Sequence, residues 1–153
     1  MALAIILAWY VCIGALAAAG SMYLSHRFVP AKHEATLYGL SLIAIAAFYL
    51  ACTSYFGGTA AWSLETVAVA AFAVMGCLGT RVPVVLMAGY ALHGGWDLLH
   101  EVQVHLHADV FGGRDATRIP LAYGAFCTTF DWAMVGYFAY RRRPWVAAWK
   151  SRA

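Results

Sequence analysis

The 153-residue sequence has few charged side chains, and this scarcity argues against a water-soluble domain. Only 11% of its residues are Asp, Glu, Lys or Arg, whereas 63% are hydrophobic. A soluble domain carries roughly 25% charged residues. The chain also has no low-complexity tract, no internal repeat and no linker long enough to separate domains. We therefore expect residues 1–153 to form one integral membrane domain.

Other absences narrow the class of function. The four cysteines lie far apart in apolar segments and form no CxxC pair, so we interpret them as small buried residues. Gly112-Gly113 is typical of a turn, and no GK[ST] phosphate-binding sequence follows it. The only dense basic cluster is the C-terminal tail. This distribution argues against nucleic-acid binding.

Five apolar segments each have about the 20 residues that a membrane-crossing helix needs. Backbone groups in lipid must be satisfied internally, which favours helices. The sequence therefore predicts an all-α bundle of five transmembrane helices, at about residues 2–23, 36–56, 61–80, 82–104 and 120–140. The four prolines all lie at or near the predicted helix ends, so none is expected to kink a helix at its centre.

The distribution of Lys and Arg predicts the orientation of this bundle. If the C-terminus is cytoplasmic, eight of the ten basic residues lie inside and only Arg114 and Arg118 lie outside. Cytoplasmic loops of membrane proteins are enriched in Lys and Arg. We therefore predict an outside N-terminus, a cytoplasmic C-terminus and a multi-pass protein of the cell inner (plasma) membrane.

The predicted helix 82–104 carries four ionisable residues on one face. His93, Asp97, His100 and Glu101 fall within an arc of about 100° on a helical wheel. Charged groups in a bilayer cost several kcal/mol each unless they are paired, hydrated or bound to a metal. Asp131 lies at a similar depth to His93 in the last predicted helix, so we expect these two side chains to meet.

Metal binding is the first interpretation of this face. His93, Asp97 and His100 are the predicted ligands, because two imidazoles and one carboxylate form a common set for zinc or for non-haem iron. The candidate acid/base residues are Asp131, Glu101 and Glu34. Two other interpretations stay open: a metal-free acid/base or proton-relay site, and a structural hydrogen-bond network.

The three interpretations of this polar face predict different functions. The first is a membrane enzyme, hydrolase-like or isomerase-like, that acts on a lipid or another hydrophobic small molecule with zinc or iron bound. The second is a transporter or sensor that uses the same residues to bind protons, a metal ion or a small ligand. The third is a structural subunit whose polar residues are fully paired.

Several short motifs resemble those of a known group of proteins. They are His93-Gly-Gly-Trp-Asp97-Leu-Leu-His100, Ile119-Pro-Leu-Ala-Tyr123, Phe126-Cys-Thr-Thr-Phe-Asp131 and His33-Glu-Ala-Thr-Leu-Tyr-Gly39. With them the chain resembles, over nearly its whole length, a family of small polytopic membrane proteins that carries a domain-of-unknown-function label. The resemblance implies a compact helical bundle and no established activity.

Overall fold

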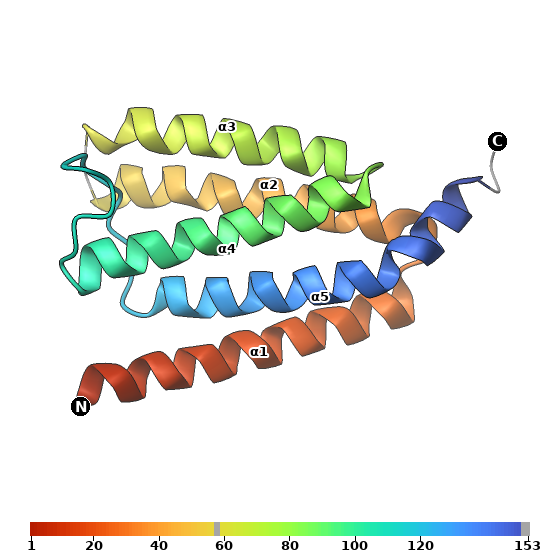
Figure 1. Cartoon of the computed structure of the whole chain (residues 1–153), viewed down its shortest axis with the longest axis horizontal. Coiled ribbons are helices and arrows are strands. Elements are labelled where there is room, and N and C mark those ends of the chain that lie inside the picture. The colour runs from red at the N-terminus through yellow and green to blue at the C-terminus, as the bar shows by residue number, and fades with distance from the viewer. Residues whose placement is uncertain (57–58, 151–153) are drawn as a thin grey trace.

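The computed structural model describes residues 1–56 and 59–150, and no strand occurs within these ranges. The described chain forms five helices (Figure 1): α1 (Ala2–Phe28), α2 (Ala31–Phe56), α3 (Ala61–Gly79), α4 (Pro83–His105) and α5 (Tyr123–Lys150). The all-α class and the five helices predicted from the sequence are therefore confirmed.

Three helices within the described residues are long and apolar enough to cross a membrane, namely α1, α2 and α3. α4 and α5 have the length but carry most of the buried ionisable residues, and these lower their average hydropathy. The three apolar helices support the interpretation that this chain is a membrane protein. The five-span arrangement and its orientation remain predictions.

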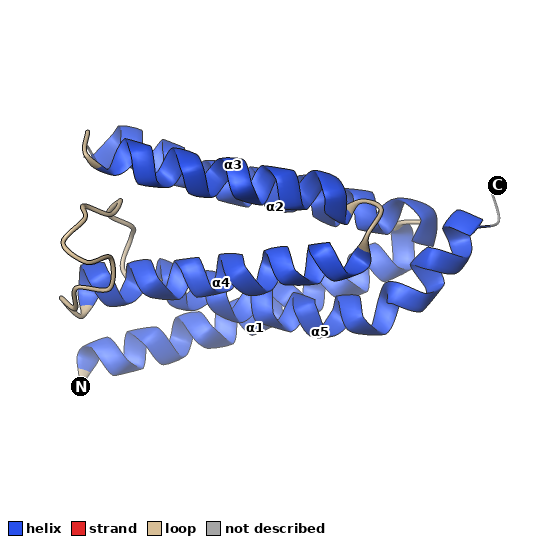
Figure 2. Cartoon of the chain, turned by 45° about the horizontal axis from the view of Figure 1, so that its top comes forward, coloured by secondary structure: helices blue, strands red, loops and turns tan. Residues whose placement is uncertain are grey.

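The helices run side by side along one axis (Figure 1), with α1 packed along α5 and α2 along α3. Turning the molecule shows α2 and α3 as one layer and α1, α4 and α5 as the other (Figure 2). We call the end where α1, α3 and α5 finish the basic end, and the opposite end, with segment 106–122, the loop end. The described cations at the basic end are Arg27, Lys32, Arg81, Arg141, Arg142, Arg143 and Lys150.

Small residues allow the helices of each layer to approach closely. A Cβ atom added to Gly76 of α3 would lie 2.6 Å from the carbonyl oxygen of Gly39 in α2. Only glycine fits at such a crossing, which is a frequent packing mode of membrane helices. The central core is aromatic and aliphatic, with Tyr38, Leu42, Leu86, Tyr90, Met134, Phe138 and Trp145 among its buried members.

Three helix boundaries differ clearly from the predicted ones. α1 continues to Phe28 rather than ending near residue 23. α2 begins at Ala31 rather than near residue 36, because the Pro30 carbonyl accepts the N–H groups of His33 and Glu34 and so starts the first turn. α5 continues to Lys150 rather than ending near residue 140. Pro144 thus lies inside α5 and not at its end. Because proline has no N–H group, it removes one backbone hydrogen bond from the helix. The last turns of α5 turn away from the bundle (Figure 1).

Candidate metal centre and neighbouring polar clusters

The four ionisable residues on the predicted polar face of α4 all point into the bundle, as their spacing predicts. His93, Asp97, His100 and Glu101 are each no more than 4% exposed. They do not form one site, however, because their partners lie on different elements. Three clusters result: the aspartate cluster (His93, Asp97 and Asp131), the Glu65–His100 pair, and Glu101 with the start of α5.

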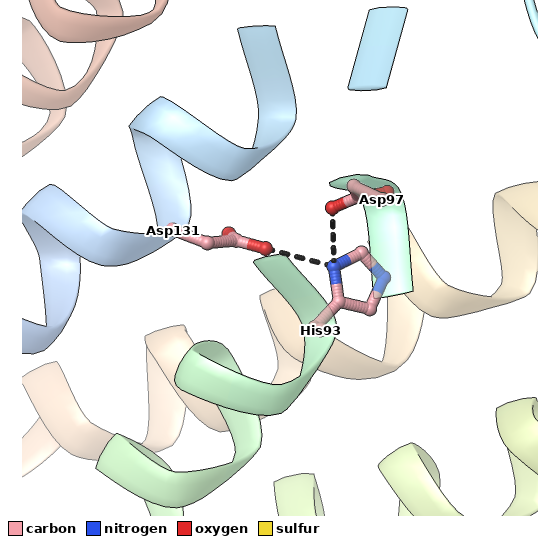
Figure 3. A group of neighbouring side chains, drawn as sticks. All are labelled: His93, Asp97 and Asp131. Atoms are coloured by element: carbon pink, nitrogen blue, oxygen red, sulfur yellow. Dashed lines mark hydrogen bonds and ion pairs between the residues drawn. The ribbon is translucent and has the colours of Figure 1, made fainter. Parts of the chain in front are cut away.

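The aspartate cluster brings two carboxylates to one ring nitrogen (Figure 3). His93 Nδ1 lies 2.8 Å from Asp131 Oδ2 and 3.0 Å from Asp97 Oδ2. The predicted meeting of His93 and Asp131 is thereby confirmed. A single N–H group on Nδ1 cannot point at both oxygens. The geometry of a hydrogen bond is met only by Asp131 Oδ2, and Asp97 Oδ2 is buried without a hydrogen-bond partner. The hydroxyl of Tyr49 donates to Asp97 Oδ1 at 2.6 Å.

Close contact between α4 and α5 makes this cluster possible. A Cβ atom on Gly94 would lie 3.1 Å from Asp131 Cβ and 2.9 Å from the Trp132 ring, so a larger residue would force the two helices apart. The Thr128 hydroxyl donates to the Gly94 carbonyl at 2.8 Å and fixes the same crossing. Gly95, by contrast, meets open space.

A cavity of about 230 Å³ adjoins the aspartate cluster. His93 and Asp131 line it together with side chains of α2 and α5, which are Ile45, Tyr123, Phe126, Cys127 and Phe130. Most of these walls are apolar or aromatic. The cavity therefore suits a hydrophobic group that reaches the two ionisable residues from between the helices.

The donor set of the aspartate cluster is compatible with a metal ion. One ligand atom from each of His93, Asp97 and Asp131 can be chosen so that all three lie within 4.8 Å of one another. Zinc bonds of about 2.0–2.2 Å in tetrahedral geometry place ligand atoms about 3.3 Å apart. The observed separations of 2.8 and 3.0 Å are shorter, so an ion would have to move the side chains apart by a few tenths of an ångström.

His100, the third ligand predicted from the sequence, belongs to a different cluster. Its Nε2 atom lies 2.8 Å from Glu65 Oε1, and its Nδ1 atom lies 3.0 Å from the Trp96 carbonyl. Both ring nitrogens thus face acceptors, so one proton lies on Nδ1 and a second lies between Nε2 and Glu65 Oε1. The backbone N–H of Thr117 also donates to Glu65 Oε1, at 3.1 Å, which ties segment 106–122 to α3.

Glu101 is placed as a helix cap. Its carboxylate accepts the backbone N–H groups of Ala122 at 3.0 Å and of Gly124 at 2.9 Å, at the first turn of α5. Unpaired N–H groups at a helix start are often satisfied by an acidic side chain in this way. The two bonds account for the position of Glu101 without the acid/base role predicted from the sequence, which stays a prediction.

Glu34 lies near the basic end in a network of its own. One carboxylate oxygen accepts Arg141 Nε at 2.9 Å, Arg141 Nη2 at 2.6 Å and Trp145 Nε1 at 2.7 Å, and the other accepts the Tyr137 hydroxyl. Glu34 is fully buried and Arg141 is 8% exposed. This network joins α2 to α5 and is separate from the aspartate cluster, to which the sequence could not assign it.

Sequence reasoning missed four of the partners in these clusters. They are Tyr49 in the aspartate cluster and Tyr137, Arg141 and Trp145 around Glu34. A signal for the last three is present in the sequence, because they are spaced by four residues and so share one helical face. That face could have been matched to the buried acid Glu34.

Comparison of the chain with protein-family models, with curated proteins and with solved structures finds no match in any of the three. The function of the protein is therefore inferred from its polar clusters and from the apolar helices that hold them.

Proposed function

We propose that this protein is a five-span inner-membrane enzyme that binds a divalent metal ion at His93, Asp97 and Asp131. Its substrate in this proposal is a lipid or another hydrophobic small molecule, and its reaction is hydrolytic. The observation that carries the proposal is the buried meeting of two carboxylates at one imidazole, beside a cavity with mainly apolar walls.

Charge balance favours an additional cation in the aspartate cluster. Two carboxylates and one imidazolium carry a net charge of −1, which is costly to bury in the middle of an apolar bundle. Two carboxylates, a neutral imidazole and a divalent ion are together neutral. The unpaired buried oxygen of Asp97 is then available as a ligand atom, and Tyr49 holds the other oxygen of the same carboxylate in place.

The cavity supports the choice of reaction. Three protein ligands leave one coordination position open, as in catalytic zinc sites. A metal ion held in this way would supply a nucleophilic water at neutral pH and polarise a carbonyl or phosphoryl group. The aromatic side chains of Phe126 and Phe130 line the cavity and would position the hydrophobic part of a substrate against His93 and Asp131.

Metal analysis of the full chain tests the first half of the proposal. Protein purified in detergent and loaded with Zn²⁺ or Fe²⁺ should retain about one ion per chain after dialysis. Asp131→Asn and His93→Ala should weaken retention at least tenfold. His100→Ala is the matched control, because it removes a buried histidine of α4 outside the aspartate cluster. Unchanged retention in Asp131→Asn, or no metal in wild type, would overturn the metal assignment.

A second candidate function, proton transport or sensing, also has a specific observation behind it. The 2.8 Å separation of His93 Nδ1 from Asp131 Oδ2 is that of a hydrogen bond, and one extra proton on a carboxylate neutralises the cluster as well as a metal does. This candidate predicts metal-free protein that moves or binds protons when reconstituted in vesicles. Hydrolysis of lipid esters by metal-loaded wild type, lost in Asp131→Asn, would decide for the enzyme.

A further inference from the structure

A groove at the basic end combines cationic side chains with apolar walls. It has a volume of about 480 Å³ and lies between the first turn of α4 and the last turns of α5. Arg142, Arg143 and Lys150 supply its charge, and Val84 and Val146 are among its apolar wall residues. It shares no lining residue with the cavity beside the aspartate cluster.

The three cations of the groove form no ion pair with any other residue that the structure describes. Within residues 1–56 and 59–150, neither Arg142, Arg143 nor Lys150 forms an ion pair, whereas the neighbouring Arg141 is satisfied by Glu34. The first turn of α4 contains no acidic residue, and its N-cap residue Val82 makes no side-chain capping bond. The charged side chains among the described residues that line the groove are therefore all positive, and an anion is the complementary ligand.

The apolar walls restrict what kind of anion fits. Val84 is 62% exposed and Val146 is 37% exposed, so hydrocarbon surface borders the cations directly. The groove is at one end of the apolar helices α1, α2 and α3, where a membrane surface would meet the protein. A water-soluble anion would leave the valines uncovered, whereas a phospholipid would place its phosphate on the cations and its acyl chains on the valines.

We propose that this groove binds an anionic phospholipid through its phosphate group, with the lipid acting as a bound partner rather than as the substrate of the aspartate cluster. Basic pockets between membrane helices on the cytoplasmic side commonly bind such headgroups. The volume suffices for a headgroup and the first carbons of its chains, because pockets for small ligands are typically about 300–1,000 Å³. Each cation contributes roughly a fivefold factor in affinity at an anionic surface.

Lipid binding to the full chain in neutral detergent tests the proposal. Phosphatidylglycerol and phosphatidylcholine with the same acyl chains are compared by native mass spectrometry, and inorganic phosphate is added as a soluble competitor. We expect preferential binding of phosphatidylglycerol. The triple variant Arg142→Gln/Arg143→Gln/Lys150→Gln should bind it about a hundredfold more weakly, and Val146→Trp should weaken it by filling the groove.

The matched control is Arg27→Gln/Lys32→Gln/Arg81→Gln, which removes the same charge from the basic end outside the groove. It should keep most of the preference for phosphatidylglycerol. An equal loss in this control would show that general electrostatics and not the groove binds lipid, and would overturn the proposal. Displacement by millimolar phosphate would instead identify a site for free anions. Unchanged binding in the groove variant would also refute it.

Discussion

Replacement of Glu34 by glutamine should destabilise the bundle strongly, because this carboxylate is the only charge that compensates Arg141 among the described ion pairs. Glu34→Gln keeps the size of the side chain but removes its charge. The new amide can keep its carbonyl oxygen on the Arg141 and Trp145 donors, but its NH2 group then replaces the oxygen that accepts the Tyr137 hydroxyl. The result is a buried cation without its anion.

The structure sets the size of the effect. Glu34 accepts four hydrogen bonds from Tyr137, Arg141 and Trp145, and side-chain hydrogen bonds between membrane helices contribute about 0.6 kcal/mol each on average. Their complete loss gives about 2.4 kcal/mol. Breaking one side of a buried ion pair costs about 3–5 kcal/mol. We therefore expect the free energy of unfolding to fall by about 2–5 kcal/mol.

Unfolding by SDS in mixed micelles, followed by tryptophan fluorescence, measures this change. Lys32→Gln is the control on the same helix, since Lys32 is exposed, and it should change stability by less than about 0.5 kcal/mol. The double variant Glu34→Gln/Arg141→Gln should lose less than the sum of the two single variants, because no uncompensated charge remains. A Glu34→Gln protein as stable as wild type would refute the assignment of a structural role to this network.

Three further outcomes follow from other parts of the molecule. Gly94→Val should disrupt the contact of α4 with Trp132 and lower the unfolding midpoint, whereas Gly95→Val, which meets open space, should not. Glu101→Ala should lower the free energy of unfolding by about 1–2 kcal/mol in the same SDS titration, because it removes the cap of α5. A loss of activity without any loss of stability would instead favour the catalytic role. A topology reporter inserted at 112–113 should report the outside and one at the C-terminus the cytoplasm; two reporters on the same side would contradict the five-span arrangement.

The helices and the buried face of α4 could be predicted because they depend on local sequence. Long apolar segments define where helices occur, and a spacing of three and four residues defines which side chains share a face. The meeting of His93 with Asp131 was also predictable, since both are polar residues at similar depth in neighbouring segments. Burial of His93, Asp97, His100 and Glu101 followed from the cost of exposing them to lipid.

The division of that face into separate clusters was not predictable from one sequence. His93 and His100 lie on the same side of α4, but two turns apart, and the helix that packs opposite each one decides its partner. α5 supplies Asp131 to His93, while α3 supplies Glu65 to His100. The position of Glu101 depends similarly on where segment 106–122 returns to the bundle, which helical periodicity does not specify.

The contacts between α4 and α5 have a consequence for how the protein is made. In a five-span protein, α4 must carry Asp97 and, near its end, Glu101 out of the translocon, and α5 must carry Asp131. An acidic residue at a helix centre opposes insertion by about 2.5–3.5 kcal/mol. As a hairpin, the two helices already contain His93 for Asp131 and the N–H groups of Ala122 and Gly124 for Glu101. We therefore expect α4 and α5 to enter the bilayer as a pair, after the three apolar helices that precede them.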